Sequence, residues 1–298
     1  MVRLADYVVV VGYDFEKSTD LESQGRVLQR FPTKEWNNYP YEFHVESFCQ
    51  PCGWQLTKNR QAPTFFVAYL TDVDGSHYYA ACLTFYEAVS SQQQHIIQHC
   101  SHGNRTAATA ISDAHNYQAA TIISPDGSLS PLNSCENMAA VASNVGGAGV
   151  DPNLVRPTEL FAPKCIVLLA RHQHFKVLQN CLSILYTVFM DGPKGLYLEE
   201  IIGNIVGGVE IPPIGGPRKT FTVGANDRQT VQPAKCQTIP VTRSSVASLF
   251  KYLGIDNVLL MFTAMLSDQK LLVCSQSLVR LTDACHALTS IIYPLKYG

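Results

Sequence analysis

The sequence predicts a mixed α/β protein whose first part is built from strands and whose last part is built mainly from helices. Two observations lead to this fold class. Short β-branched and alternating apolar runs, bounded by turn residues, occupy the first part of the chain and are typical of strands. Beyond residue 174, apolar residues recur instead at spacings of three and four, as on one face of a helix. With 298 residues and 46% hydrophobic content, the chain has enough apolar material for about two domains.

Five runs have the length and composition of strands. They are residues 7–13, 26–31, 64–71, 78–86 and 164–170. The first is a continuous apolar run rich in β-branched residues, which indicates a strand covered on both faces. Asp74-Gly75 lies between the third and fourth runs, and Asp-Gly in this position is a strong signal for a hairpin. A β-hairpin is therefore expected over residues 64–86.

Composition changes sharply after the hairpin. Residues 90–157 contain few charges and consist mostly of Ala, Ser, Gln, Asn, His and Gly, with no sustained apolar period. Such a segment buries too little apolar surface to offset the entropy lost on ordering it. Because strand-like sequence resumes at residue 164, we expect residues 90–157 to be a disordered insertion within the first domain.

Helices follow the insertion. The apolar spacing predicts helices at residues 175–190 and 196–209, separated by Asp191-Gly192-Pro193, and a loop over residues 211–217 resembles a domain boundary. Residues 219–223 and 230–232 are candidate edge strands. Ser244 or Ser245 is expected to cap a helix that runs to residue 252 and ends at Gly254.

The last fifty residues are predicted to form two helices, a buried strand at residues 270–274 and a long final helix. The final helix has an apolar stripe made of Leu278, Leu281, Ala284, Cys285, Leu288, Ile291 and Ile292. Such a stripe normally packs on the next strand of a sheet, and each large apolar side chain left in water forgoes roughly 1.5–3 kcal/mol. We therefore expect residues 1–298 to be a truncated form of a longer protein, poorly stable on its own.

Charge and composition exclude several classes of function. Lys and Arg total 22 against 24 Asp and Glu, so no basic field attracts nucleic acid or an anionic membrane. No apolar run approaches the ~20 residues that a transmembrane helix requires. Most cysteines are scattered singly in apolar stretches, as reduced core cysteines are. These features predict a soluble intracellular protein.

Candidate catalytic and metal motifs are weak. Cys49 and Cys52 have zinc-knuckle spacing, but no second pair of ligands lies at a suitable distance. His95, His99, Cys100 and His102 cluster in the biased insertion, where composition explains them. The glycine-rich runs lack the context of a nucleotide-binding loop, and no nucleophile motif occurs. We expect no metal, no cofactor and no bond-making chemistry.

Several blocks, taken in order, resemble a DENN module. They are DYVVVVGY at 6–13, QRFP at 29–32, FCQPCGWQL at 48–56, LTDVDG and CLTFYE within 70–87, FAPKCIVLLAR at 161–171, DRQ at 227–229, LFKYLGIDNVLLMF at 249–262, DQKLLVCS at 268–275 and YPLKY at 293–297. Within that family the sequence of these blocks is most similar to that of the SET-binding factors, which are pseudophosphatases related to the myotubularins. The resemblance implies a longin-like upstream domain at residues 1–192 and a central α/β domain, a sheet flanked by helices, at 193–298. The central domain lacks its expected downstream part.

The resemblance also implies a function. DENN proteins act as guanine nucleotide exchange factors for Rab small GTPases, an activity that needs no catalytic nucleophile, base or cofactor. It implies a cytoplasmic protein recruited peripherally to endomembranes. Dimerisation with myotubularin-family proteins would use regions outside this chain. A non-catalytic assembly or membrane-tethering module is the alternative. A GTPase-activating role would need an exposed arginine, for which Arg171 and Arg228 are the candidates.

Residues of the GTPase-facing surface are expected where polar or aromatic groups stand at the ends of predicted elements. Arg171, His172 and Phe175 lie at a strand-to-helix turn, whereas Asp268 precedes the predicted buried strand and Lys270 begins it. Binding residues gather at such positions because loops are exposed and a rigid scaffold holds them in place. The alternative is that these five are ordinary solvated loop residues.

Overall fold

The computed structural model describes most of the chain outside the predicted insertion. The described residues are 2–17, 23–37, 39–41, 44–71, 77–90, 93, 121–123, 129–131, 159–191, 197–224, 227–236, 246–293 and 295. The chain divides into one unit made of residues 1–96 and 159–298 and another made of residues 97–158. In the second unit the structure describes β5 (Thr121–Ile123) and β6 (Leu129–Pro131), which pair in antiparallel fashion. The predicted disorder of the insertion otherwise lies outside the described residues.

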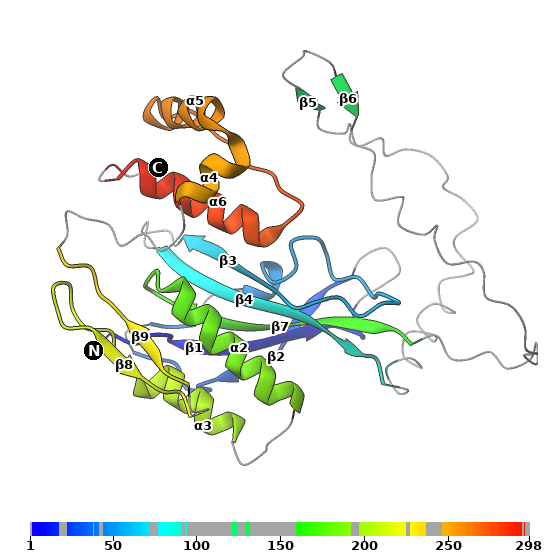
Figure 1. Ribbon diagram of the computed structural model, residues 1–298. Coiled ribbons are helices and arrows are strands. Elements are labelled where there is room, and N and C mark those ends of the chain that lie inside the picture. The colour runs from blue at the N-terminus through cyan, green and yellow to red at the C-terminus, as the bar shows by residue number, and fades with distance from the viewer. Residues whose placement is uncertain are drawn as a thin grey trace, which may run out of the picture. The chain divides into compact units, whose positions relative to one another are not determined.

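A five-stranded antiparallel sheet forms the centre of the larger unit (Figure 1). Its strands are β1 (Tyr7–Tyr13), β2 (Gly25–Phe31), β3 (Thr64–Thr71), β4 (His77–Ala88) and β7 (Phe161–Ala170), in the order β2-β1-β7-β4-β3. All five predicted strands are confirmed. The β3–β4 hairpin is confirmed by its pairing, which runs to Thr71 opposite His77, whereas the Asp-Gly turn lies outside the described residues.

The continuous apolar run of β7 follows from its position between β1 and β4. Successive side chains of a strand point to opposite faces. Ile166, Leu168 and Ala170 join one core cluster, and Cys165, Val167 and Leu169 join another on the opposite face. A strand that is buried on both faces has no solvent-facing position for a polar residue, which is why its sequence does not alternate.

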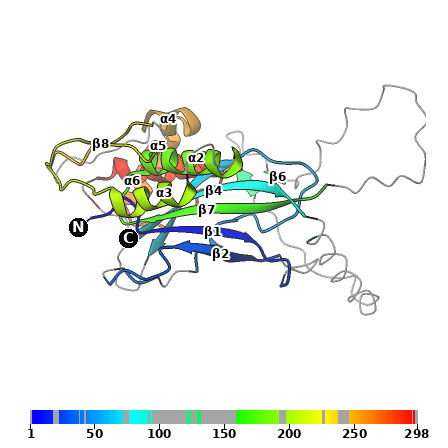
Figure 2. The same ribbon diagram turned by 90° about the horizontal axis from the view of Figure 1, so that it is seen from below.

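Helices cover one face of this sheet. These are α2 (Phe175–Asp191) and α3 (Leu198–Gly203), the latter continuing into a π-helical turn at Asn204–Gly208 (Figure 2). They confirm both helices predicted after the insertion. The opposite face is covered by a segment that carries Trp36, Tyr39 and Trp54 and includes a short 3-10 helix at Val45–Ser47.

The two candidate edge strands form a ribbon of their own. β8 (Lys219–Phe221) and β9 (Gln229–Val231) pair with each other and do not extend the five-stranded sheet. Val223 and Val231 bury their side chains in the core cluster beneath α2, and the side chain of Asn180 donates to that of Gln229 over 2.9 Å. The ribbon therefore packs on the helical layer.

Three helices complete the described chain: α4 (Val246–Leu253), α5 (Ile255–Leu266) and α6 (Leu278–Ile291). Gly254 ends α4 with φ of 77°, as predicted, because only glycine adopts such a backbone without strain. The predicted cap at Ser244 or Ser245 lies outside the described residues. The three helices share a small core of their own, to which Leu249, Val258 and Leu288 contribute.

The prediction of a buried strand at residues 270–274 is wrong. This segment has no strand structure and pairs with no described strand, and the side chain of Leu272 is 90% exposed. The flanking Leu271 and Val273 pack partly against the cluster of α4, α5 and α6. Periodicity alone does not separate a buried strand from an extended connector in which alternate residues are covered.

The expectation that the α6 stripe lacks a partner is also wrong for much of its length. Ala284, Leu288 and Ile292 are buried against α4 and α5, while Leu278 packs at the opposite core cluster of the sheet. The hydroxyl of Thr282 accepts a hydrogen bond from the backbone of Val67 in β3 over 3.4 Å. The helix thus rests on both α4 and the edge strand.

Among the described residues, no single helix is long and apolar enough to span a bilayer. Helices α4 and α5 satisfy the length and composition test only when taken together, and they are bent by 113° at the break between them.

Candidate functional site

The turn between β7 and α2 is the centre of the predicted site. Residues 171–174 connect the central strand of the sheet to the helix that crosses one of its faces. The backbone carbonyl of His174 accepts hydrogen bonds from the amides of Val177 and Leu178, at 2.9 and 3.0 Å, which fixes the start of α2. The side chains of the turn therefore project from a rigid strand end and a rigid helix start.

Arg171 is held by a buried carboxylate. Its Nε and Nη2 atoms donate to the two oxygens of Asp6, both over 3.1 Å, and the Asp6 side chain is fully buried. The guanidinium also lies 5.5 Å from the ring centre of Tyr39. A bidentate pair of this kind is both strong and geometrically specific. Arg171 is thus a structural residue in this conformation.

A second arginine completes this ion cluster. Arg3 Nε donates to Asp6 over 2.8 Å, and its guanidinium lies 3.9 Å from the ring centre of Trp36. The indole nitrogen of Trp36 donates in turn to the backbone carbonyl of Asp6 over 2.8 Å. A single buried carboxylate therefore ties the start of β1 to the end of β7. Because Asp6 engages the guanidinium of Arg171, the geometry does not present this arginine to a nucleotide, whereas Arg228 is exposed.

A groove of about 660 Å³ lies on one side of the turn. Its lining includes His172 and Gln173 from the turn and a proline-rich wall at residues 211–214. That wall is held by the chain start, since the amide of Ile211 donates to the carbonyl of Val2 over 2.8 Å. Partial burial lowers the pKa of His172, and the positive charge of Arg171 lowers it further. His172 therefore offers a neutral imidazole to the groove at neutral pH.

A second groove, of about 370 Å³, lies on the other side of the turn. It runs between the first turn of α2 and helix α6, and its lining includes the ring of Phe175, which lies 4.9 Å from the ring of His286. Phe175 also packs edge-on against Tyr79, at 5.3 Å between ring centres. Lys176 and Asp283 bring opposite charges to this groove. The surface thus combines aromatic shape with a few polar groups, as protein-binding surfaces do.

The five predicted site residues do not form one cluster. Arg171 and His172 line the first groove and Phe175 lines the second, and Gln173 lines both. Asp268 and Lys270 stand on the exposed connector between α5 and α6, where Asp268 adopts φ of 54°, and they line neither groove. Whether a GTPase touches any of the five stays a prediction.

Sequence reasoning missed the partners of these residues. Asp6 directly precedes β1 and Arg171 directly follows β7, and antiparallel pairing places the start of one strand beside the end of the other. That signal becomes visible only once the two strands are assumed to be neighbours. His286 lies on α6 and packs on Phe175 from a distant part of the chain, so no local pattern marks it.

Two matches to known families cover most of the described chain. Residues 25–85 match the uDENN domain and residues 161–298 match the DENN (AEX-3) domain. The chain carries a uDENN domain followed by a DENN domain. The first match holds β2, β3 and most of β4, and the second begins at β7, so strands from both lie in the same sheet. The resemblance to a DENN module is therefore confirmed.

A curated relative supports the same assignment. The chain is 28% identical over 142 residues to the DENN domain and WD repeat-containing protein SCD1 of Arabidopsis thaliana. The match covers 47% of this chain and 12% of that protein, so the chain spans only a small part of the relative's length. The finer resemblance to the SET-binding factors stays a prediction, as does the domain boundary at residue 193.

Proposed function

We propose that this uDENN–DENN chain acts on a Rab-family small GTPase as a guanine nucleotide exchange factor. The observation that carries the proposal is the ordered pair of matches, uDENN and then DENN, since DENN domains are generally Rab exchange modules. The likeness to a DENN and WD repeat protein adds to this support.

Exchange fits the chemistry of the described surface. An exchange factor binds the nucleotide-free GTPase more tightly than the GDP-bound one, and by linkage it lowers the affinity for GDP by the same factor. Such coupling needs a complementary surface and no bond-making group. The two grooves beside the β7–α2 turn supply aromatic rings, amides and single charges on rigid elements. We place the GTPase contact on these grooves.

Release of a fluorescent GDP analogue from a panel of purified Rab proteins tests the proposal. The chain is expected to speed release from at least one Rab and to bind that Rab most tightly when it is free of nucleotide. Faster GTP hydrolysis with unchanged GDP release would instead favour a GTPase-activating role. If no Rab responds and none binds, the exchange proposal is wrong.

Charge reversal locates the contact. Lys176 is exposed at the second groove, where its ammonium group donates to Gln179 over 3.1 Å on the same helix, so its removal should leave the fold intact. Lys176→Glu is expected to lower the exchange rate about tenfold, the equivalent of roughly 1.4 kcal/mol. Lys58→Glu makes the same change on an exposed loop and should leave the rate unchanged. Equal effects of the two substitutions would show that the GTPase does not contact this groove.

The connector between α5 and α6 needs a separate test. Lys270 is exposed and lines neither groove, so Lys270→Glu changes charge without disturbing a described contact. A lower exchange rate with unchanged thermal stability would extend the GTPase-binding surface to this connector. An unchanged exchange rate would show that Asp268 and Lys270 do not belong to the GTPase-binding surface.

A second candidate function is a non-catalytic assembly or membrane-tethering module. It is favoured by apolar side chains left in solvent on α5, where Ile255 is 66% exposed, Leu259 is 55% exposed and Leu260 is 69% exposed. Large exposed apolar groups that lie together are typical of interaction surfaces. In either role we propose a cytoplasmic protein recruited peripherally to endomembranes. Fractionation of cells that express the tagged chain, with Leu260→Glu as the comparison, separates the two roles when combined with the exchange assay.

A further inference from the structure

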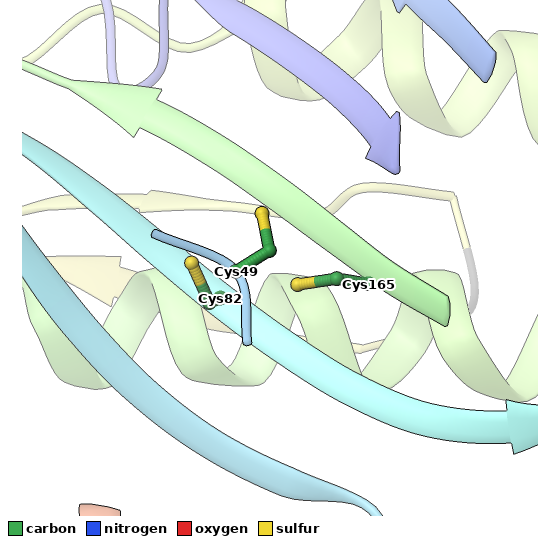
Figure 3. A group of neighbouring side chains, drawn as sticks. All are labelled: Cys49, Cys82 and Cys165. Carbon is green, nitrogen blue, oxygen red and sulfur yellow. The ribbon is translucent and has the colours of Figure 1, made fainter. Parts of the chain in front are cut away.

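Three cysteines from separate parts of the chain meet in the core of the sheet (Figure 3). They are Cys82 on β4, Cys165 on β7 and Cys49 in the segment that follows the short 3-10 helix. Their sulfur atoms all lie within 4.8 Å of one another, and each of the three residues is fully buried. Nothing in the proposed exchange function uses these thiols.

Strand pairing explains the convergence. Thr84 lies opposite Cys165 and Cys82 lies opposite Val167, so the two cysteines are diagonal neighbours on one face of adjacent strands. Cys49 reaches them from the segment packed over that face. The sequence associates Cys49 with Cys52, three positions along in the same motif, but Cys52 is exposed and outside the group. The fold therefore builds a three-sulfur site that no sequence spacing reveals.

We propose that Cys49, Cys82 and Cys165 bind a single Cu⁺ ion through their three sulfur atoms. Sulfur ligands select soft cations such as Cu⁺ and exclude the hard ions Mg²⁺ and Ca²⁺. Zn²⁺ in closed structural sites takes four ligands, and among the described residues no fourth Cys, His, Asp or Glu joins the group. Three sulfur ligands in a fully buried site suit an ion with trigonal coordination.

The spacing of the sulfurs is close to what such an ion requires. With a metal–sulfur distance of about 2.3 Å, trigonal geometry places the sulfurs roughly 4.0 Å apart. The present separations, all within 4.8 Å, need a contraction of less than about 1 Å. Cys49 stands on a segment outside the sheet, so small movements of this segment suffice to close the site.

The proton balance of binding is defined by the thiols. The thiol of Cys49 donates to the carbonyl of Val45 over 3.1 Å, and that of Cys82 donates to the carbonyl of Ala80 over 3.5 Å. The thiol of Cys165 donates to the carbonyl of Ile166 over 3.9 Å. Cu⁺ bound to one thiolate and two neutral thiols forms a site of zero net charge, which the apolar core accepts at the lowest cost. Each sulfur that becomes a thiolate ligand releases its proton to solvent, and no electron is transferred.

The test uses the full chain, kept reduced and free of oxygen, with one equivalent of Cu⁺ and a competing chelator. The chain is expected to retain one Cu⁺ and to show ultraviolet sulfur-to-copper charge transfer, with three sulfur neighbours by X-ray absorption. Retention should increase with pH, because binding releases protons. The same titration with Zn²⁺ should leave no zinc bound after the chelator challenge.

Variants assign the copper to this site. Cys165→Ser and Cys82→Ala should each lose the retained copper and its absorption, whereas Cys52→Ser, at an exposed cysteine, should keep both. Circular dichroism checks that each variant is folded, and the sulfur count of the wild-type protein is informative without any variant. The proposal is overturned if the wild-type chain retains no Cu⁺, if fewer than three sulfurs bind it, if Zn²⁺ is retained in its place, or if Cys52→Ser loses copper to the same extent as Cys165→Ser.

Discussion

Replacement of Arg171 by Met tests whether this residue is structural. The substitution keeps an unbranched side chain beside Tyr39 and removes both hydrogen bonds to Asp6, each of 3.1 Å. The Asp6 carboxylate remains fully buried and keeps its ion pair with Arg3 over 2.8 Å. The fold therefore loses one of two positive partners of a buried carboxylate while the surrounding packing is disturbed little.

The magnitude follows from burial. Removing one partner of a buried ion pair costs about 3–5 kcal/mol, because the other charge is left uncompensated. We expect about 3 kcal/mol, the lower end, since Arg3 stays in place and the Arg171 side chain is 25% exposed. Arg26→Met is the control, because the ion pair of Arg26 with Glu16 spans 3.4 Å with side chains 52% and 72% exposed. An exposed pair of this kind contributes about 0–1 kcal/mol.

Urea unfolding at neutral pH measures the difference. With a slope of about 3 kcal/mol per molar urea, Arg171→Met should lower the midpoint by about 1 M at unchanged slope. A double-mutant cycle with Asp6→Asn should give a coupling energy of about 1.5–3 kcal/mol. If Arg171→Met costs no more than Arg26→Met, while GTPase binding is lost, the structural assignment is refuted and Arg171 belongs to the interface.

Three further predictions concern other parts of the fold. Burial lowers the pKa of His286, so the unfolded chain takes up its proton first as the pH falls below about 6.5, and stability that is complete above this pH is lost below it. Wild type should therefore lose more Tm between about pH 7.5 and about pH 5.5 than His286→Phe, and equal losses would contradict the reasoning. Leu272→Asp should change the free energy of unfolding by less than about 0.5 kcal/mol, since the side chain is 90% exposed. A loss of several kcal/mol in chemical denaturation would instead support a buried strand at residues 270–274. Gly25→Ala should cost about 1–3 kcal/mol, because its Cβ would lie 2.2 Å from the ring of Trp54, whereas Gly203→Ala meets no atom within 4 Å and should be neutral or stabilising in the same measurement.

The strands of the sheet were predictable because local and global signals agree there. The run at residues 7–13 is continuous and apolar since β1 lies inside the sheet, and residues 26–31 alternate since β2 is its edge. The segment at residues 270–274 shows the limit of this reasoning. It has the composition of β7, but it lacks a described neighbouring strand, and neighbours are set by tertiary structure that no local window contains.

The three-cysteine group shows the same limit for sites. Cys49, Cys82 and Cys165 are far apart in the chain, and each reads by itself as a small core residue. Only the register of β4 against β7, together with the segment packed above them, brings their sulfurs together. A search by ligand spacing finds the exposed Cys52 instead, since spacing rules describe sites whose ligands share one turn or hairpin.

Arg171 shows why a polar residue at a strand end has two opposite interpretations. Loops at strand ends carry binding residues, but the end of one antiparallel strand also lies beside the start of its neighbour, where a counter-charge such as Asp6 can be buried. A substitution that breaks such a pair lowers stability and thereby lowers any activity, so loss of exchange by Arg171→Ala alone would not show contact with a GTPase. The contact has to be located with side chains that lie at the same turn or at the start of α2 and form no described ion pair with a buried carboxylate. His172 and Lys176 meet that condition in the described structure, which makes them the stronger probes of the exchange surface.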